Sequence, residues 1–225
     1  MEKPLKDRTK AGRLLAEKLT AYANREDVTV LGLPRGGVPV AFEIAKRLKA
    51  PLDVFVVRKL GVPWQEELAM GAIATGGVRV LNDEVVKAYA ISAEDIALVE
   101  AKEKKELERR ERAYRGDRPP LDVRGRTVIL VDNGIATGTT VRAGLAALRK
   151  LQPARIVVAV AVAPESTFEE LKAEADEVVC ILTPEAFIAI SMWYERFAQT
   201  TDEQVRDLLA RAVQQKTAAV STSTR

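Results

Sequence analysis

The chain has 225 residues, of which 47% are hydrophobic and 30% are charged, and its charges nearly cancel at a net +3. This length suits one α/β domain with a small appendage, and the balanced charge gives no reason to expect nucleic-acid binding. The chain has no histidine and one cysteine, Cys180. These counts exclude Ser-His-Asp hydrolysis, His-ligated zinc, an internal disulfide and a thiolate metal cluster.

The first residues lack the apolar segment of a secretory signal, and no apolar run approaches the ~20 residues that span a membrane. We therefore expect a cytoplasmic protein with no membrane partner. The chain is poor in Asn, Cys and Met and rich in Ala, Arg and Glu. That composition is typical of thermophilic proteins.

The first part of the chain predicts alternating helices and strands. Apolar spacing predicts a helix over 8–24, a strand over 28–33, a helix over 38–48 and a second strand over 53–58. The predicted strands are apolar throughout, which is typical of a parallel sheet covered by helices on both faces. The expected fold class is therefore α/β, with a mostly parallel sheet.

Residues 60–115 depart from this pattern. Glycines interrupt residues 60–77, and a brief strand over 78–81 is expected to form a hairpin with part of that segment. Ser92, with Asp95 three residues later, predicts the N-cap of a helix that runs to about Tyr114. The helix is highly charged and its apolar stripe is thin, so we interpret the charges as a solvent-exposed face.

The last part of the chain predicts strands over 155–162 and 177–182, with a short helix between them. Residues 184–215 contain several aromatic residues and a helix over 202–213, and the small polar residues of 216–225 predict a disordered tail. We therefore expect a core over 1–183 that contains the insertion 60–115, a small unit over 184–215, and the tail.

The apolar strand 128–131 ends in Asp132 and leads through Gly and Thr residues into a helix that begins near Thr139. Unpaired N–H groups and the positive end of the helix dipole favour phosphate binding there, and threonine hydroxyls add donors. Asp132 is placed to accept hydrogen bonds from a sugar. The alternative is an ordinary strand–helix connection in which Gly and Thr serve as turn and cap residues. Walker and dinucleotide motifs are absent from the sequence.

A second loop, Pro34-Arg35-Gly36-Gly37, also follows an apolar strand and precedes a helix. Its glycines allow the backbone to turn inward, and Arg35 offers a bidentate cation. Arg58 and Lys59 close the next strand, so they should face the same edge of the sheet. The alternatives are an ordinary glycine-rich turn and solvated charges at a strand end.

Residues 128–140 resemble the 5-phosphoribosyl 1-diphosphate (PRPP) signature of the type I phosphoribosyltransferases, a hydrophobic strand, two acids and a loop that ends Thr-Gly-x-Thr. Asn133 stands where the second acid usually lies. The resemblance implies a phosphoribosyltransferase-like fold with a C-terminal hood, and catalytic roles for Asp132, Asn133 and Arg35. It implies that the 5′-phosphate binds to Gly134, Ile135, Ala136, Thr137, Gly138, Thr139 and Thr140. It implies that the diphosphate binds to Arg35, Gly36, Gly37, Arg58 and Lys59.

In the same family terms, residues 60–115 occupy the place of the flexible catalytic loop and residues 184–215 the place of the hood. Trp193 or Tyr194 would stack on the acceptor base there, with core packing as the alternative for both. The implied cofactor is Mg²⁺, held by the diphosphate and not directly by the protein, with a water contact to Asp132 as an option. The implied partners are PRPP and a nucleobase-like molecule; a homodimer is left open.

The predicted function is transfer of the phosphoribosyl group from PRPP to a nitrogen acceptor, with release of pyrophosphate. The alternative is a non-catalytic PRPP or nucleotide sensor on the same fold, which the departure at Asn133 favours. A nucleic-acid-binding regulator is a weaker alternative because the net charge is small. A Mg²⁺ phosphoesterase would need clustered carboxylates that the sequence does not show.

Overall fold

The computed structural model describes residues 4–223, and the side chains of residues 4–215. Its centre is a five-stranded parallel sheet in the order β2-β1-β6-β7-β8. The strands are β1 (Val28–Gly32), β2 (Leu52–Val54), β6 (Thr127–Asp132), β7 (Arg155–Val162) and β8 (Glu177–Leu182). The predicted α/β fold with a mostly parallel sheet is therefore confirmed.

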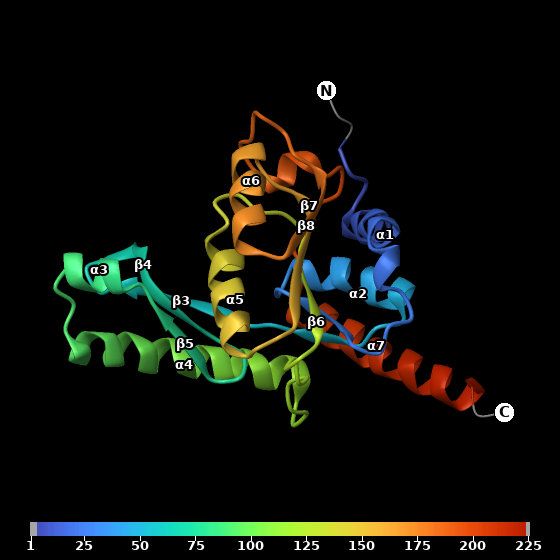
Figure 1. Cartoon of the computed structure of the whole chain (residues 1–225), viewed down its shortest axis with the longest axis horizontal. Coiled ribbons are helices and arrows are strands. Elements are labelled where there is room, and N and C mark those ends of the chain that lie inside the picture. Colours follow the sequence, from blue (N-terminus) through green and yellow to red (C-terminus); the bar gives the residue numbers. More distant parts are fainter. Residues whose placement is uncertain (1–3, 224–225) are drawn as a thin grey trace.

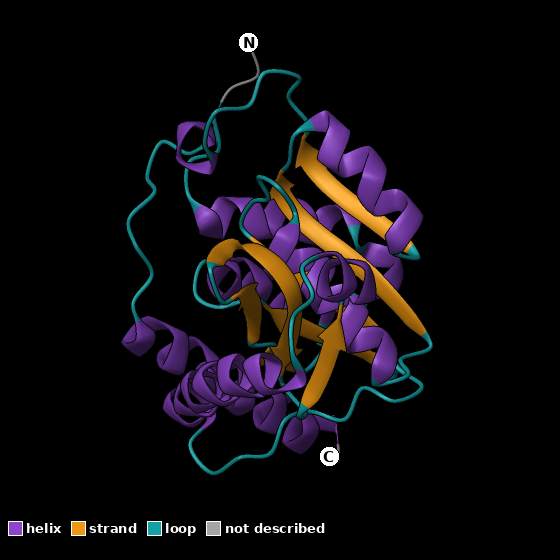
Figure 2. Ribbon diagram, turned by 90° about the vertical axis from the view of Figure 1, so that its left-hand side faces the viewer, coloured by secondary structure: helices purple, strands orange, loops and turns teal. Residues whose placement is uncertain are grey.

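Helices cover both faces of this sheet (Figures 1 and 2). One face packs against α1 (Arg8–Lys18) and α2 (Gly37–Leu48), and the other against α5 (Thr139–Lys150) and α6 (Glu165–Glu174). Successive side chains of a strand point to opposite faces. Ile129 and Val131 accordingly join one core cluster, whereas Val128 and Leu130 join the other. This is why the central strands are apolar throughout.

Residues 57–115, which we call the arm, project from the core (Figure 1). The arm contains a second, antiparallel sheet of β3 (Val57–Val62), β4 (Gln65–Ala74) and β5 (Val78–Leu81), followed by α3 (Asp83–Ala88) and α4 (Ala93–Arg115). The predicted hairpin over 78–81 is confirmed. The predicted N-cap is also confirmed, because the Ser92 hydroxyl accepts a hydrogen bond from the Asp95 N–H at 3.0 Å.

The prediction of one strand over 53–58 is wrong, because the chain passes there from one sheet to the other. β2 ends at Val54 and β3 begins at Val57. The Phe55 N–H still donates to the Gly32 carbonyl of β1 at 3.0 Å, whereas the Val56 N–H donates to the Thr75 hydroxyl at 2.9 Å. A distant side chain, which no local pattern reveals, therefore sets the end of the strand.

The ends of the domain also differ from the prediction. The helix expected over 8–24 ends at Lys18 and is followed by a 3₁₀ turn, η1 (Thr20–Tyr22). A second 3₁₀ turn, η2 (Ile190–Trp193), precedes α7 (Asp202–Ser223), which packs against α2 and α4. Helix α7 enters the segment 216–225, where the sequence predicts a disordered tail. This segment contains no Gly or Pro, and extending an existing helix costs little; residues 224–225 lie outside the described part.

The small antiparallel sheet appended to the core belongs to the arm and not to residues 184–215. Within residues 4–223, no helix combines the length and the apolar character needed to cross a membrane.

Candidate active site

The two loops singled out in the sequence lie side by side at the carboxyl edge of the sheet. β1 and β6 are neighbouring strands, but β1 leads into α2 on one face and β6 leads into α5 on the other face. Loops that diverge in this way leave a crevice between them, which is the usual ligand site of an open α/β sheet. The structure therefore brings residues 33–37 and 133–138 together.

The two loops are in close contact through their glycines. A Cβ atom added to Gly37 would lie 2.5 Å from the Val131 carbonyl oxygen and 3.3 Å from the Asp132 carboxylate. A Cβ atom added to Gly36 would overlap the side-chain amide of Asn133. These positions need glycine because the backbone of one loop lies directly against Asp132 and Asn133 of the other.

Residues 133–140, which we call the threonine loop, expose their donors at the start of α5. Gly138, in the left-handed conformation at φ 76°, is the N-cap of this helix and provides no side-chain cap. The hydroxyls of Thr137 and Thr139 lie 3.0 Å apart, and both residues are exposed. An uncapped helix N-terminus with adjacent hydroxyls is suited to phosphate. Part of this loop lines a cavity of about 700 Å³ whose opposite wall is the arm.

One side chain of α5 and one of α6 support the threonine loop through hydrogen bonds that the sequence did not predict. Arg142 donates to the Thr137 carbonyl at 3.1 Å and is itself held by Glu170 and by Glu174, the latter at 2.7 Å. The Thr167 hydroxyl donates to the Ala136 carbonyl at 3.1 Å. The sequence places Arg142 on the first turn of a helix, but nothing in it indicates the partners on α6.

Asp132 has an unusual protonation equilibrium. Burial raises its pKa to about 7, although the hydrogen bond from the Asn133 N–H at 2.7 Å and the Arg8 guanidinium both act to lower it. Asn133 is 8% exposed and carries no charge. An uncharged neighbour therefore adds no further repulsion to the Asp132 carboxylate.

Each of the three cations expected at the diphosphate has an acidic partner. Arg35 lies 3.7 Å from Asp202, Arg58 donates to Glu103 of α4 at 2.7 Å, and Lys59 lies 3.3 Å from Glu67. The Arg58 side chain is directed toward α4. The Lys59 side chain lines the same cavity as Thr137 and Thr139. Of the pair on β3, the structure thus groups only Lys59 with the threonine loop.

The remaining wall of the crevice joins both ends of the domain. The Leu5 N–H donates to the Trp193 carbonyl, and the Glu195 N–H donates to the Leu5 carbonyl, both at 2.8 Å. The Tyr194 hydroxyl donates to the Asn133 carbonyl at 2.5 Å, and burial raises the pKa of this hydroxyl. Tyr194 is buried, and the partly buried Trp193 packs against the core. The sequence contains no motif that signals the contribution of Leu5.

Comparison with models of protein families shows to which family the chain belongs. The model of the phosphoribosyl transferase domain matches residues 4–195. The chain belongs to the phosphoribosyl transferase domain family. The recognition made from residues 128–140 is therefore confirmed, and the matched range includes both loops and the wall formed by Leu5 and residues 193–195.

Individual relatives agree with the phosphoribosyl transferase assignment. Rv0571c of Mycobacterium tuberculosis H37Rv, whose name provisionally assigns it to the phosphoribosyl transferases, is 48% identical over 206 residues, which are 92% of this chain and 46% of that protein. The chain thus spans about half the length of this relative. The bifunctional protein PyrR of Chloroflexus aurantiacus is 35% identical over 152 residues, covering 63% of this chain and 72% of PyrR. The structure of TT1426 from Thermus thermophilus is 41% identical with a TM-score of 0.84, covering 92% and 98% of the two chains.

Proposed function

We propose that the chain binds PRPP with Mg²⁺ and transfers the phosphoribosyl group to a nucleobase-like nitrogen acceptor, releasing pyrophosphate. The observation that supports this proposal is the contact between the two loops, in which Gly36 and Gly37 lie against Asp132 and Asn133. The two loops, each of which leads into a helix, thereby lie beside the carboxylate of Asp132. A sugar that carries a phosphate at one end and a diphosphate at the other matches this arrangement.

The residues divide into three groups in this proposal. Within residues 134–140, the threonine hydroxyls and the N–H groups at the start of α5 bind the 5′-phosphate. Asp132 and the Asn133 amide accept hydrogen bonds from the ribose hydroxyls. The loop 35–37, with Lys59, binds the diphosphate and stabilises the charge of the departing pyrophosphate. Arg35 can turn to this role because its 3.7 Å pairing with Asp202 is partly exposed, and such pairs contribute little.

Mg²⁺ in this proposal is held by the diphosphate oxygens, and we assign it no protein ligand. Within residues 4–223, no group of three or more His, Cys, Asp or Glu side chains could hold a metal ion. Mg²⁺ would neutralise charge on the leaving group. The Asp132 carboxylate, whose pKa lies near 7, could contact it through water. The acceptor would bind beyond the ribose, beside the wall formed by Leu5 and residues 193–195, with Trp193 as its proposed stacking partner.

Release of pyrophosphate from PRPP, measured across a panel of nitrogen bases with and without Mg²⁺, tests the proposal. We expect release with at least one base and only with Mg²⁺. If calorimetry detects PRPP binding but no base in the panel leads to pyrophosphate release, the result would instead support the sensor, which Asn133 favours. Absence of both binding and release at millimolar PRPP would overturn both functions.

Two variants test the division of the site. Thr137→Ala should weaken the binding of nucleoside monophosphates and of PRPP alike, by at least about tenfold, because a hydroxyl bonded to a charged phosphate contributes ~1.5–3 kcal/mol. Arg35→Ala should weaken the binding of PRPP and of pyrophosphate but leave the binding of monophosphates unchanged. Thr20→Ala, an exposed threonine on η1, is the control. Equal losses for both ligand sets in both variants would show that the division is wrong.

A further inference from the structure

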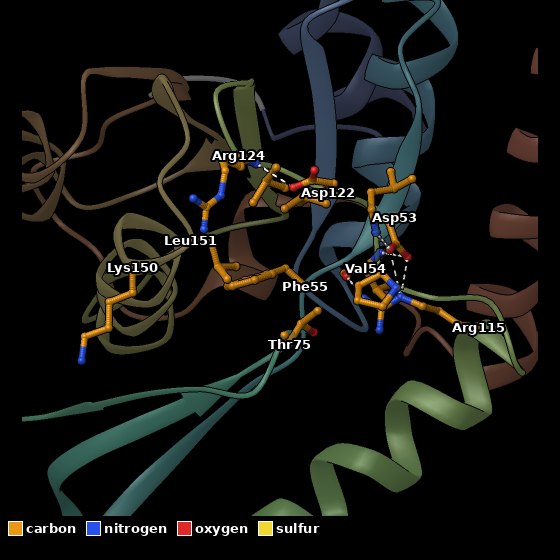
Figure 3. Close-up of a pocket in the computed structure, with 14 residues that line it drawn as sticks. Asp53, Val54, Phe55, Thr75, Arg115, Asp122, Arg124, Lys150 and Leu151 are labelled. Carbon is orange, nitrogen blue, oxygen red and sulfur yellow. Dashed lines mark hydrogen bonds and ion pairs between the residues drawn. The ribbon is translucent and has the colours of Figure 1, made fainter.

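A second cavity, of about 230 Å³, lies where the arm joins the core (Figure 3). Its walls come from the passage between β2 and β3, the turn between β4 and β5, the end of α4, the segment 120–124 and the end of α5. The threonine loop lies at the opposite end of α5, roughly 18 Å away for a helix of this length. The cavity is therefore separate from the candidate active site.

The floor of this cavity is apolar and its size is limited. Phe55, Leu31 and Val123 are buried, and Leu151 points toward Phe55 (Figure 3). Pockets for drug-sized ligands usually enclose about 300–1,000 Å³. A cavity of about 230 Å³ therefore suits a molecule with a single ring.

The polar groups at one end of the cavity are already satisfied. Arg115 donates through Nε to both oxygens of Asp53 at 2.9 Å and through Nη2 to the Val54 carbonyl at 2.5 Å. Asp53 also accepts from the Leu121 N–H at 3.2 Å. A fully paired and buried ion pair has little capacity left for a ligand.

The other end of the cavity has unused donors. The Arg124 guanidinium points into the space above Leu151 (Figure 3), and within the described residues it has no side-chain partner. Thr75 lies on the other side of Phe55 (Figure 3), where its hydroxyl oxygen accepts from the Val56 N–H at 2.9 Å. Lys150 is exposed and donates to the Arg79 carbonyl at 2.8 Å. The charges of Arg115 and Asp53 cancel. The two cations Arg124 and Lys150 outweigh the remaining acid, Asp122, so the lining has a net positive charge.

We propose that this cavity binds a small organic anion with one flat ring. The ring would lie against Phe55 and Leu151, and its anionic group would pair with Arg124. An apolar floor with a few convergent polar groups is the general form of a small-molecule site.

The position of the cavity makes this anion a regulator of the arm. Phe55, Thr75 and Arg115 are at the three places where the arm meets the core. A ligand bound among these three places would favour one orientation of the arm, because a ligand shifts a conformational equilibrium by its difference in affinity for the two states. The arm carries Lys59 into the cavity of the threonine loop. In a chain with the proposed PRPP activity, the anion would therefore change the affinity for PRPP.

Benzoate tests the proposal on the full chain, because it has the ring and the carboxylate but no nitrogen that could serve as an acceptor. We expect calorimetry to detect benzoate at millimolar concentration, with neutral benzamide binding at least about fivefold more weakly. Arg124→Gln should lower the affinity for benzoate by at least about fivefold, since a hydrogen bond to a charged group is lost. Arg47→Gln, which changes another exposed cation, on α2, is the matched control and should not change the affinity.

Hydrogen exchange locates the bound anion and reports on the arm. Benzoate should slow exchange at residues 55–56, 75–77 and 115–124, and this slowing should disappear in Arg124→Gln. No binding at tens of millimolar, equal affinity in Arg124→Gln and the parent chain, or protection confined to residues 33–37 and 133–138 would each overturn the proposal. PRPP is absent from these measurements, so their outcome is independent of the proposed transferase activity.

Discussion

At Asp132, the stability of the fold and the binding of a ligand make opposite demands. Burial raises the pKa of this carboxyl group from 3.8 to about 7, so the folded chain holds the proton more tightly than the unfolded chain does. The contribution of Asp132 to stability is therefore most favourable below pH ~4 and falls as the pH rises toward 7. The carboxylate is kept at this position at the expense of stability, as is common at functional sites.

We predict that Asp132→Asn stabilises the chain at pH 8 and leaves its stability unchanged at pH 4. The gain should be about 1–2 kcal/mol, less than the whole pKa shift would give, because water still reaches part of the carboxylate. Denaturant unfolding at the two pH values measures it. Asp27→Asn is the control of opposite sign, because a hydrogen bond from Arg25 lowers the pKa of Asp27 to about 2. An equal change at both pH values in Asp132→Asn would refute the argument.

We also predict that Asn133→Asp leaves PRPP affinity within a few-fold and raises turnover. A negative charge beside the ribose would favour a transition state in which the ring becomes cationic, more than it favours the neutral ground-state sugar. The new carboxylate would also push the pKa of Asp132 above its present value. The gain should therefore be larger at pH 9 than at pH 7, as pyrophosphate release would show. Unchanged turnover at pH 9 with intact binding would mean that the site is adapted to asparagine.

Among the helices, α6 determines how firmly the threonine loop is held. Arg142 lies on α5 and is held by two glutamates of α6. We predict that Arg142→Leu weakens the binding of 5′-phosphorylated ligands by roughly tenfold, because the Thr137 carbonyl loses its donor and the loop becomes more mobile. Calorimetry with ribose 5-phosphate measures the loss. Arg149→Leu is a matched control on α5, since Arg149 pairs with Asp176 and makes no contact with the loop. Similar losses in both variants would show that the effect is a general weakening of α5.

The elements that could be predicted from the sequence are those that local patterns determine. The apolar strands over 128–131 and 155–162, the cap at Ser92 and the two glycine loops all depend on neighbouring residues. The end of β2 depends instead on a hydrogen bond between Val56 and Thr75, 19 positions apart. The contacts of Arg142 with α6 and of Leu5 with Trp193 are likewise made by segments distant in sequence, so they required the folded chain.

Across the whole molecule, the Asp53–Arg115 pair fastens the end of the arm to the edge of the central sheet. We predict that Arg115→Met destabilises the chain by about 3–5 kcal/mol, because it leaves the Asp53 charge buried without its partner. The double variant Arg115→Met with Asp53→Leu should recover much of this loss. Denaturant unfolding of the three chains gives both values.

Arg109→Met is the control for this prediction. Arg109 lies on the same helix and pairs with Glu106 at the surface, and such a pair contributes no more than about 1 kcal/mol. A loss in Arg115→Met no larger than that of the control would mean that the packing of α4, and not the ion pair, holds the arm.

The bonds between Leu5 and residues 193 and 195 also affect the order in which the site can form during synthesis. The strands β1 and β6, which lead into the two loops proposed to bind phosphate, leave the ribosome long before residue 195 does. The wall beside Asn133 cannot close until the far end of the domain has emerged, because its two strands of backbone lie about 190 positions apart. A nascent chain could therefore present both loops while the crevice is still open on one side. Ligand binding should begin to stabilise the growing polypeptide only when translation has passed this segment.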